Sequence, residues 1–286
     1  MSALASAPAG KEIVNLPCEV CGDTCSAPWF RLRYPQYQHP GSFELRRCAG
    51  CSLVFNSPRL VDAALAKLYE RNYYLFAEAE ADAYARVSQL HQDTVARLEA
   101  LAPRGRILEV GSAKGYMLSL LRDRGWDAQG VELSTHASRF ATDRLQVPTF
   151  TGTLEHYVEQ PALQPFSVAY STDVIEHVPS PRRFLEAMHH ALVPGGLLLI
   201  GTPNVAADGI DEFGPHWLGF NPFHIWLFSR DTLARLLDRC GFDLVEAWTF
   251  GNLQPQREPQ LPVWRRLTRD SLARLGCLVA APALRQ

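Results

Sequence analysis

Near its start, the chain carries four cysteines in two Cys-x-x-Cys pairs: Cys18, Cys21, Cys48 and Cys51. Each pair has a glycine beside it, which allows a turn tight enough to aim two thiolates at one ion. Four thiolates complete a closed tetrahedral zinc site, and a closed site leaves no coordination position for chemistry. We therefore expect structural zinc that holds an N-terminal module together, with unliganded thiols as the alternative and Cys25 as a bystander or a substitute ligand.

A second feature is an apolar stretch that breaks into a turn of small residues, Ile107-Leu-Glu-Val-Gly-Ser-Ala-Lys-Gly-Tyr116. Gly111 and Gly115 allow a close approach of the backbone to a ligand, and the helix expected after them offers free N–H groups. Glu132 follows Gly111 by 21 positions, at the expected end of the next strand, where a carboxylate can accept hydrogen bonds from both ribose hydroxyls. A tight turn without a ligand is the alternative, and the carboxylate at this spacing argues against it.

The same loop lacks the signatures of the common phosphate binders. It has no Gly-Lys-Ser/Thr, and Ala113 and Tyr116 stand where the dinucleotide fingerprint has its second and third glycines. Glu109, directly before the turn, would repel a pyrophosphate and attract an ammonium group. A cofactor with a cationic amino-acid end and no phosphate fits this loop, and S-adenosylmethionine is such a cofactor.

Further motifs agree with this cofactor: Glu109-Val-Gly-Ser-Ala-Lys-Gly115, Gly130-Val-Glu-Leu-Ser134, Asp173-Val-Ile-Glu-His-Val-Pro179, Leu192-Val-Pro-Gly-Gly-Leu-Leu-Leu-Ile-Gly-Thr-Pro-Asn204 and His224-Ile-Trp-Leu-Phe-Ser229. Together they resemble the class I S-adenosylmethionine-dependent methyltransferases of the small-molecule type that includes the quinone-biosynthesis O-methyltransferases. Bacterial relatives of this type, including sugar C-methyltransferases, often begin with a zinc-binding module. Segments like Leu53-Val-Phe-Asn-Ser-Pro-Arg59 and Leu68-Tyr-Glu-Arg-Asn-Tyr-Tyr74 follow that module, so the resemblance covers roughly residues 15–250.

The resemblance implies which segments bind the cofactor. The end of the second strand binds the ribose, the segment after the third strand borders the adenine, and the residues after the fourth strand lie beside the methionine part. The cofactor-binding residues expected are Glu109, Gly111, Ser112, Ala113, Gly115, Tyr116, Glu132, Leu133, Thr153, Leu154, Ser171 and Asp173. Ala113 replaces the usual glycine and Lys114 the usual small polar residue, which predicts weaker or slightly shifted binding at worst.

Methyl transfer from a sulfonium requires alignment of the acceptor and, for some acceptors, removal of a proton. His177 follows the expected fourth strand and is a candidate general base near neutral pH, or it is hydrogen-bonded into its loop. Glu176 would orient that histidine or bind a divalent ion with the substrate. His224 would line the acceptor pocket or cap the helix that follows Ser229.

The elements that must position these residues follow from the hydrophobic periodicity. From Arg106 onward, short apolar runs alternate with helical periods, which is typical of a parallel α/β sheet. Strands are expected over residues 106–110, 128–133, 147–151, 166–170, 197–202 and 242–249, and only residues 277–281 offer a last strand. Helices are expected over residues 61–69, 82–101, 115–124, 135–144, 181–192 and 230–239.

The expected fold is a Rossmann-like class I methyltransferase sandwich of the α/β class, with a small zinc-ribbon-like module and a helical lid. Its expected segments are a flexible N-terminus (1–14), the zinc-binding module (15–60), a lid or linker that carries Tyr73 and Tyr74 (61–103), the cofactor-binding domain (104–251) and a tail that offers a last helix and strand (252–286).

The composition restricts the kinds of partner. A net charge of −2 gives no general attraction to nucleic acid or to an anionic membrane, and no apolar run is long enough for a membrane span. The start lacks the features of a secretory signal, so we expect a cytoplasmic protein, as a monomer or homodimer. The expected acceptor is a sugar nucleotide, a quinone precursor or a natural-product intermediate. The alternatives are an RNA methyltransferase whose zinc module grips RNA and a non-catalytic binding protein that retains the cofactor.

Overall fold

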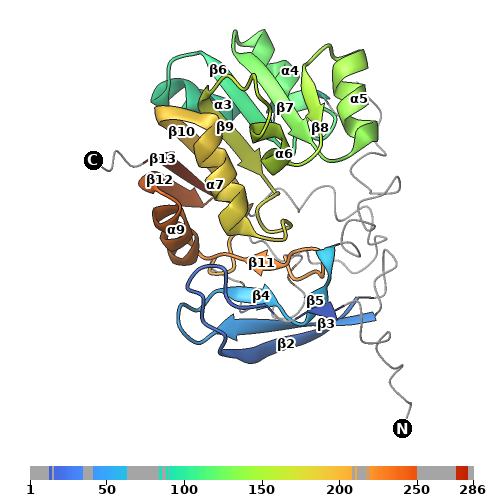
Figure 1. Ribbon diagram of the computed structural model, residues 1–286, viewed down its shortest axis with the longest axis vertical. Helices are drawn as coiled ribbons and strands as arrows, with labels where there is room; N and C mark the ends of the chain where they lie inside the picture. Colours follow the sequence, from blue (N-terminus) through green and yellow to red (C-terminus); the bar gives the residue numbers. More distant parts are fainter. Residues whose placement is uncertain are drawn as a thin grey trace.

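The computed structural model describes residues 13–14, 16–34, 41–62, 84–85, 88–89, 91–207, 210, 217, 219–249 and 275–282. Figure 1 shows a layered α/β part above a smaller β-sheet part that the N-terminal segment builds. Tyr73, Tyr74 and most of the expected lid lie outside the described residues. In the part of the chain described, every helix is too short or too polar to cross a membrane.

The α/β part contains a seven-stranded sheet in the order β12-β13-β10-β9-β6-β7-β8. Its strands are β6 (Arg106–Val110), β7 (Asp127–Glu132), β8 (Thr149–Thr151), β9 (Phe166–Thr172), β10 (Leu192–Pro203), β12 (Phe242–Thr249) and β13 (Leu275–Pro282). The neighbouring strands β10, β9, β6, β7 and β8 pair in parallel. Strand β13 lies between β10 and β12 and is antiparallel to both. The last strand that the sequence offered is therefore present and is inserted next to β10.

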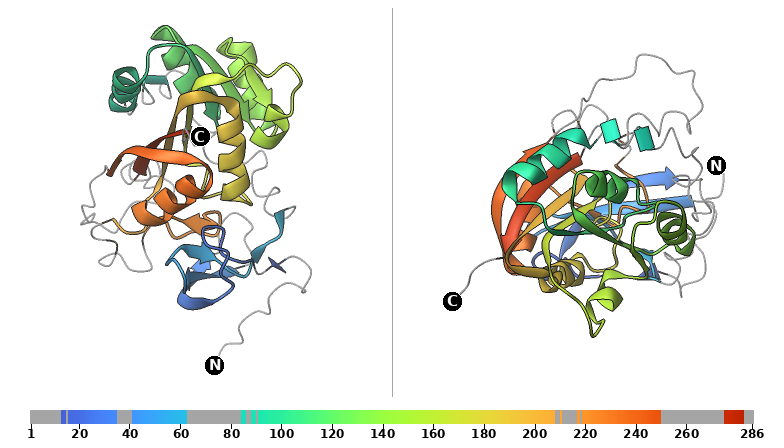
Figure 2. Two further views of the ribbon diagram at one scale, coloured as in Figure 1. Left: turned by 60° about the vertical axis from the view of Figure 1, so that its left-hand side comes forward. Right: turned by 90° about the horizontal axis from the view of Figure 1, so that it is seen from above.

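Helices cover both faces of this sheet. They are α3 (Gln92–Leu101), α4 (Tyr116–Asp123), α5 (Thr135–Arg144), α6 (Leu154–Val158), α7 (Pro181–Ala191) and α9 (Arg230–Arg239). Alternate strand residues point to opposite faces, so Ile107 packs with α3 and α4 while Leu108 packs with α6, α7 and α9. Seen from above in Figure 2, α3 and α7 lie on opposite sides of the sheet.

Local signals explain where these helices begin. Ser134, Ser180 and Ser229 each accept a hydrogen bond from a backbone N–H in the first turn of the helix that follows, and Pro181 occupies the first turn of α7. The bounds expected for α5, α9, β6 and β12 are confirmed. Of the helix expected over 82–101, α3 covers Gln92–Leu101, and residues 84–85 and 88–89 are also helical.

The smaller part is a four-stranded sheet in the order β11-β4-β3-β2. Strands β2 (Ser26–Tyr34), β3 (Gly41–Cys48) and β4 (Val54–Asn56) come from the N-terminal segment, whereas β11 (Trp226–Leu227) follows the large sheet's fifth strand, β10, in sequence. The short strands β1 (Ile13–Val14) and β5 (Arg59–Leu60) pair separately. The two parts of the molecule therefore share a sheet through β11, which lies between them in Figure 1.

Candidate functional site

The turn after β6 has the backbone that the expected cofactor loop requires. Gly111 and Gly115 both have a φ of 78°, and a Cβ atom on Gly111 would lie 2.2 Å from the Val174 side chain. Ala113 also has a positive φ, of 47°. An alanine therefore adopts the left-handed conformation at the position where the family has a glycine, which costs strain but leaves the loop its shape.

Glu132 ties this loop to the end of β7. One carboxylate oxygen accepts a hydrogen bond from the Ala113 N–H at 2.8 Å, and the other accepts one from the Ser134 N–H at 2.7 Å. Burial raises the pKa of Glu132, while these backbone N–H groups oppose that rise. Leu133, the next residue, is 56% exposed and thus leaves an apolar surface beside the carboxylate.

Glu109 is a buried carboxylate directly below the loop. Its side chain is 6% exposed, and among the described residues its Oε2 atom has no hydrogen-bond partner. Burial, followed by the charge of Glu132, raises the pKa of Glu109 well above its ordinary value. A buried carboxyl oxygen without a partner in such a place suits a cationic group of a ligand, so the residues present fit S-adenosylmethionine.

The other expected cofactor residues lie around the same edge of the sheet with different roles. The Ser171 hydroxyl donates to the Val110 carbonyl at 3.0 Å, so it joins β9 to β6. Thr153 caps α6, and the Leu154 side chain is part of the hydrophobic core. Asp173 has a φ of 56°, and burial raises its pKa to about 7. The remaining two, Ser112 and Tyr116, are buried.

The three predicted catalytic residues come together, although His224 lies far from the adjacent pair Glu176 and His177 in the sequence. The rings of His177 and His224 lie 4.7 Å apart, and the Glu176 Oε1 atom is 3.7 Å from the His177 Nε2 atom. One ligand atom from each residue lies within 4.8 Å of the others. Glu176 is fully buried and accepts a hydrogen bond from the Thr202 hydroxyl at 2.9 Å.

Backbone carbonyls fix the orientation of both histidines. The Nδ1 atom of His177 bonds the Phe223 carbonyl at 2.9 Å, and that of His224 bonds the Gly219 carbonyl at 2.8 Å. A carbonyl oxygen only accepts, so each Nδ1 carries a proton and each neutral ring has its acceptor at Nε2. Burial lowers the pKa of His177 to about 3 and that of His224 to about 4, which makes both rings neutral at pH 7.

Two details of this cluster bear on the sequence expectations. Ser229 caps α9 together with Thr232, as the alternative for this segment had it, whereas the His224 Nδ1 atom bonds the Gly219 carbonyl. Thr202, the partner of Glu176, was not among the expected site residues. The signal for it was its position at the carboxyl end of a predicted strand, where parallel sheets bind ligands.

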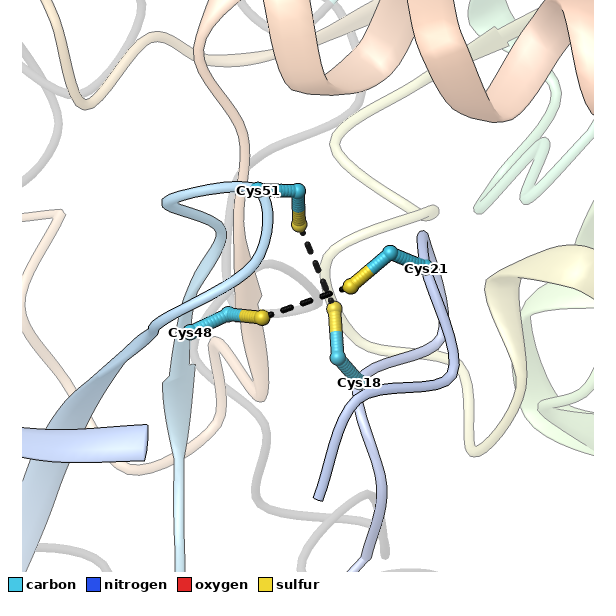
Figure 3. Close-up of side chains that lie close together, drawn as sticks. All are labelled: Cys18, Cys21, Cys48 and Cys51. Carbon is cyan, nitrogen blue, oxygen red and sulfur yellow. Dashed lines mark hydrogen bonds between the residues drawn. The ribbon is translucent and has the colours of Figure 1, made fainter. Parts of the chain in front are cut away.

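The four paired cysteines form a single cluster, drawn in Figure 3. Their sulfurs approach from two turns of the same kind, in which Gly22 N–H bonds the Cys18 carbonyl and Ser52 N–H bonds the Cys48 carbonyl. The Sγ atoms of Cys18 and Cys51 lie 3.5 Å apart, and all four sulfurs lie within 4.8 Å. Tetrahedral zinc with bonds of about 2.3 Å places its sulfurs about 3.8 Å apart, so this donor set fits zinc.

Comparisons with known proteins agree with this geometry. Residues 57–247, more than half of the chain, match the family model described as "Methyltransferase domain". The chain is 30% identical over 154 residues to tRNA U34 carboxymethyltransferase of Chromohalobacter salexigens and 26% identical over 162 residues to ubiquinone biosynthesis O-methyltransferase of Xylella fastidiosa. These matches cover 48% and 49% of this chain, and 44% and 65% of those relatives' lengths.

A solved structure shows the same fold at low sequence identity. The SAM-dependent methyltransferase from Archaeoglobus fulgidus superposes with a TM-score of 0.51 at 15% identity, over 73% of this chain and 100% of that protein. The central sheet and the family match therefore lead to one conclusion. The chain belongs to the methyltransferase-domain family, and its fold is the one seen in that S-adenosylmethionine-dependent methyltransferase.

Proposed function

We propose that this protein transfers a methyl group from S-adenosylmethionine to a small-molecule acceptor. The observation that carries the cofactor assignment is the pair of buried carboxylates at one loop. The Glu109 Oε2 atom lacks a hydrogen-bond partner in the described structure, and Glu132 lies at the strand end that binds ribose in such folds. The exposed Leu133 would pack against the adenine, and the backbone of Gly111 to Tyr116 would surround the methionine part.

The chemistry on the acceptor side is assigned to His177. The bound cofactor supplies an electrophilic methyl group whose sulfonium sulfur becomes a neutral thioether as the carbon–sulfur bond breaks. His177 would take the acceptor's proton at Nε2, because its Nδ1 is already bonded to Phe223. Glu176, whose Oε1 atom lies 3.7 Å from the same Nε2 atom, would help to orient the ring. His224 packs edge-on against the same ring and would line the acceptor's binding place.

We further propose that Cys18, Cys21, Cys48 and Cys51 bind one structural zinc ion in the module of residues 15–60. Burial raises the pKa of Cys51 to about 11 and also raises that of Cys18, so without a cation these thiols would stay protonated. A bound zinc ion would hold all four as thiolates. Such a site needs reduced cysteines, which suits the cytoplasmic location expected from the sequence.

The acceptor class is tested by transfer of a labelled methyl group. Purified protein is incubated with S-adenosylmethionine labelled on its methyl group and with a cell extract that has been divided into small-molecule, RNA and protein fractions. The proposal predicts label in the small-molecule fraction, where mass analysis identifies a sugar nucleotide, a quinone precursor or another metabolite. Label in the RNA fraction would support the RNA alternative instead. Cofactor binding without transfer to any fraction would contradict the proposed activity.

A further inference from the structure

The segment that carries Glu176 and His177 is bonded to the N-terminal module rather than only to its own domain. The Glu176 carbonyl accepts a hydrogen bond from the Ile225 N–H at 2.8 Å. The Ile225 carbonyl in turn accepts one from the N–H of Asn56, at the end of β4, also at 2.8 Å. A strand of the cysteine module thus lies two backbone hydrogen bonds away from the proposed acceptor side.

A second connection begins between the first two cysteines. Glu19 lies between Cys18 and Cys21, and its Oε2 atom accepts a hydrogen bond from the Ser180 hydroxyl at 2.7 Å. The same hydroxyl accepts a bond from the Arg183 N–H and so caps α7. Arg182 also donates to the Glu19 carbonyl at 3.0 Å. A carboxylate at this place is favourable for the positive end of the α7 dipole.

Two more backbone carbonyls of the segment 176–180 accept hydrogen bonds, one from β11 and one from the N-terminal module. The Trp226 indole donates to the Val178 carbonyl at 2.9 Å, and Trp226 pairs with Phe55 of β4. Arg59, only 5% exposed, donates to the Pro179 carbonyl at 3.5 Å. Each end of the segment 176–180 therefore contacts the module or the strand paired with it.

The packing between the two parts is continuous. Cys18, Val20 and Leu53 belong to the same buried cluster as Phe184 and Leu185 of α7. The hydrogen bonds of the cofactor loop, in contrast, run to β7 through the carbonyl of Val131 and the carboxylate of Glu132. A disturbance of the cysteine cluster should therefore reach α7 and leave the cofactor loop in place.

We infer that Glu19 is a positioning residue that connects the cysteine cluster to the start of α7, and through it to His177 and Glu176. The metal module is then a support of the acceptor side, and release of its ion loosens that side specifically. This inference rests on the proposed zinc site and on the proposed roles of His177 and Glu176. Its central contact, from Glu19 to Ser180, is a feature of the chain itself.

Hydrogen–deuterium exchange of the full-length protein tests the inference without any methyl transfer. The samples are the wild type before and after zinc removal with a strong chelator, Glu19→Ala, and Glu19→Gln. Glu19→Gln keeps an oxygen that accepts from Ser180. Asp231→Ala is the matched control, because Asp231 is an exposed carboxylate in the first turn of α9 and lies outside the contacts described above. Metal analysis of every sample records its zinc content.

We expect Glu19→Ala to retain its zinc while the amides of residues 176–186 exchange about tenfold faster, as the loss of one charge-assisted hydrogen bond predicts. Glu19→Gln keeps the acceptor but loses the charge, so its amides should exchange at a rate between those of the wild type and Glu19→Ala, and Asp231→Ala should exchange like the wild type. Zinc removal should accelerate the same amides in the wild type and leave residues 106–132 unchanged. Acceleration confined to residues 16–60 after zinc removal, or wild-type exchange in Glu19→Ala, would overturn the inference.

A protein purified without zinc would refute the proposed metal site, and the Glu19→Ala comparison would still test the connection to α7. A protein that transfers no methyl group would refute the proposed activity, whereas the exchange result would stand. In an active enzyme, Glu19→Ala should lower kcat and leave the Kd for the cofactor unchanged. Equal losses in both quantities would show that Glu19 supports the whole fold rather than the acceptor side.

Discussion

Replacement of Glu132 by alanine is the most direct perturbation of the cofactor site. The two carboxylate oxygens accept hydrogen bonds from Ala113 and Ser134 at 2.8 Å and 2.7 Å, so the side chain is held with its remaining lone pairs available to a ligand. Both ribose hydroxyls of the cofactor would use those lone pairs. Glu132→Ala removes these two acceptors and also releases the N–H of Ala113 at the centre of the loop.

The size of the effect follows from these bonds. A hydrogen bond to a charged group contributes about 1.5 kcal/mol at the lower end of its range, so two bonds contribute about 3 kcal/mol. This corresponds to roughly a 100-fold rise in the Kd for the cofactor. Glu132→Ala also removes the hydrogen bond that holds the Ala113 N–H, and this loss should raise the Kd further. The 100-fold value is therefore a lower bound.

Isothermal titration with S-adenosylhomocysteine measures this Kd without turnover. Asp127→Ala is the matched control, since Asp127 is an exposed carboxylate at the opposite end of the same strand and pairs with Arg106. It should bind the cofactor like the wild type. A Kd for Glu132→Ala within twofold of the wild type would refute the assignment of the ribose to this strand end.

Three further predictions concern the other carboxylate, the proposed base and the metal. The pKa of Glu109 is raised in the cofactor-free protein, and a bound cation favours the ionised form of this side chain. The Kd for S-adenosylmethionine should therefore fall as the pH rises through that pKa, and then level off. Glu109→Gln should flatten this pH dependence, and an unchanged profile in that variant would contradict the role of Glu109. His177→Ala should lower kcat about 100-fold or more and leave cofactor affinity unchanged, while His190→Ala, on the exposed face of α7, should have wild-type kinetics. Metal analysis should find about one zinc ion per chain. Cys48→Ser should lose this ion and Cys25→Ser should retain it. Equal zinc loss in both variants would contradict the four-cysteine assignment.

Much of the large sheet could be predicted because its signals are local. The bounds of β6 follow from a continuous apolar run that ends at a glycine turn, and those of α5 and α9 follow from a serine cap and a helical period. The proposed cofactor residues on this sheet could be named because the carboxyl ends of parallel strands meet at one edge. The strand β10 extends further than expected, since Leu192 already pairs with Phe166 of β9.

The connection of the two parts could not be predicted, because it depends on contacts between distant segments. Strand β11 has only two residues, too few for a periodic pattern, and its pairing with β4 joins residues far apart in the sequence. In the sequence, Glu19 is an ordinary polar residue between two cysteines, and only the fold places Ser180 within hydrogen-bonding distance of it. The orientation of His177 and His224 was also hidden, since it is set by backbone carbonyls that carry no residue-specific signal.

A crystal structure of the protein soaked with S-adenosylhomocysteine would show where the cofactor binds. We predict ribose hydroxyls within hydrogen-bonding distance of Glu132, the ligand's ammonium group on the side of Glu109, and the sulfur turned towards His177. A ligand bound elsewhere, or one whose sulfur faces away from the cluster of His177, Glu176 and His224, would contradict this prediction.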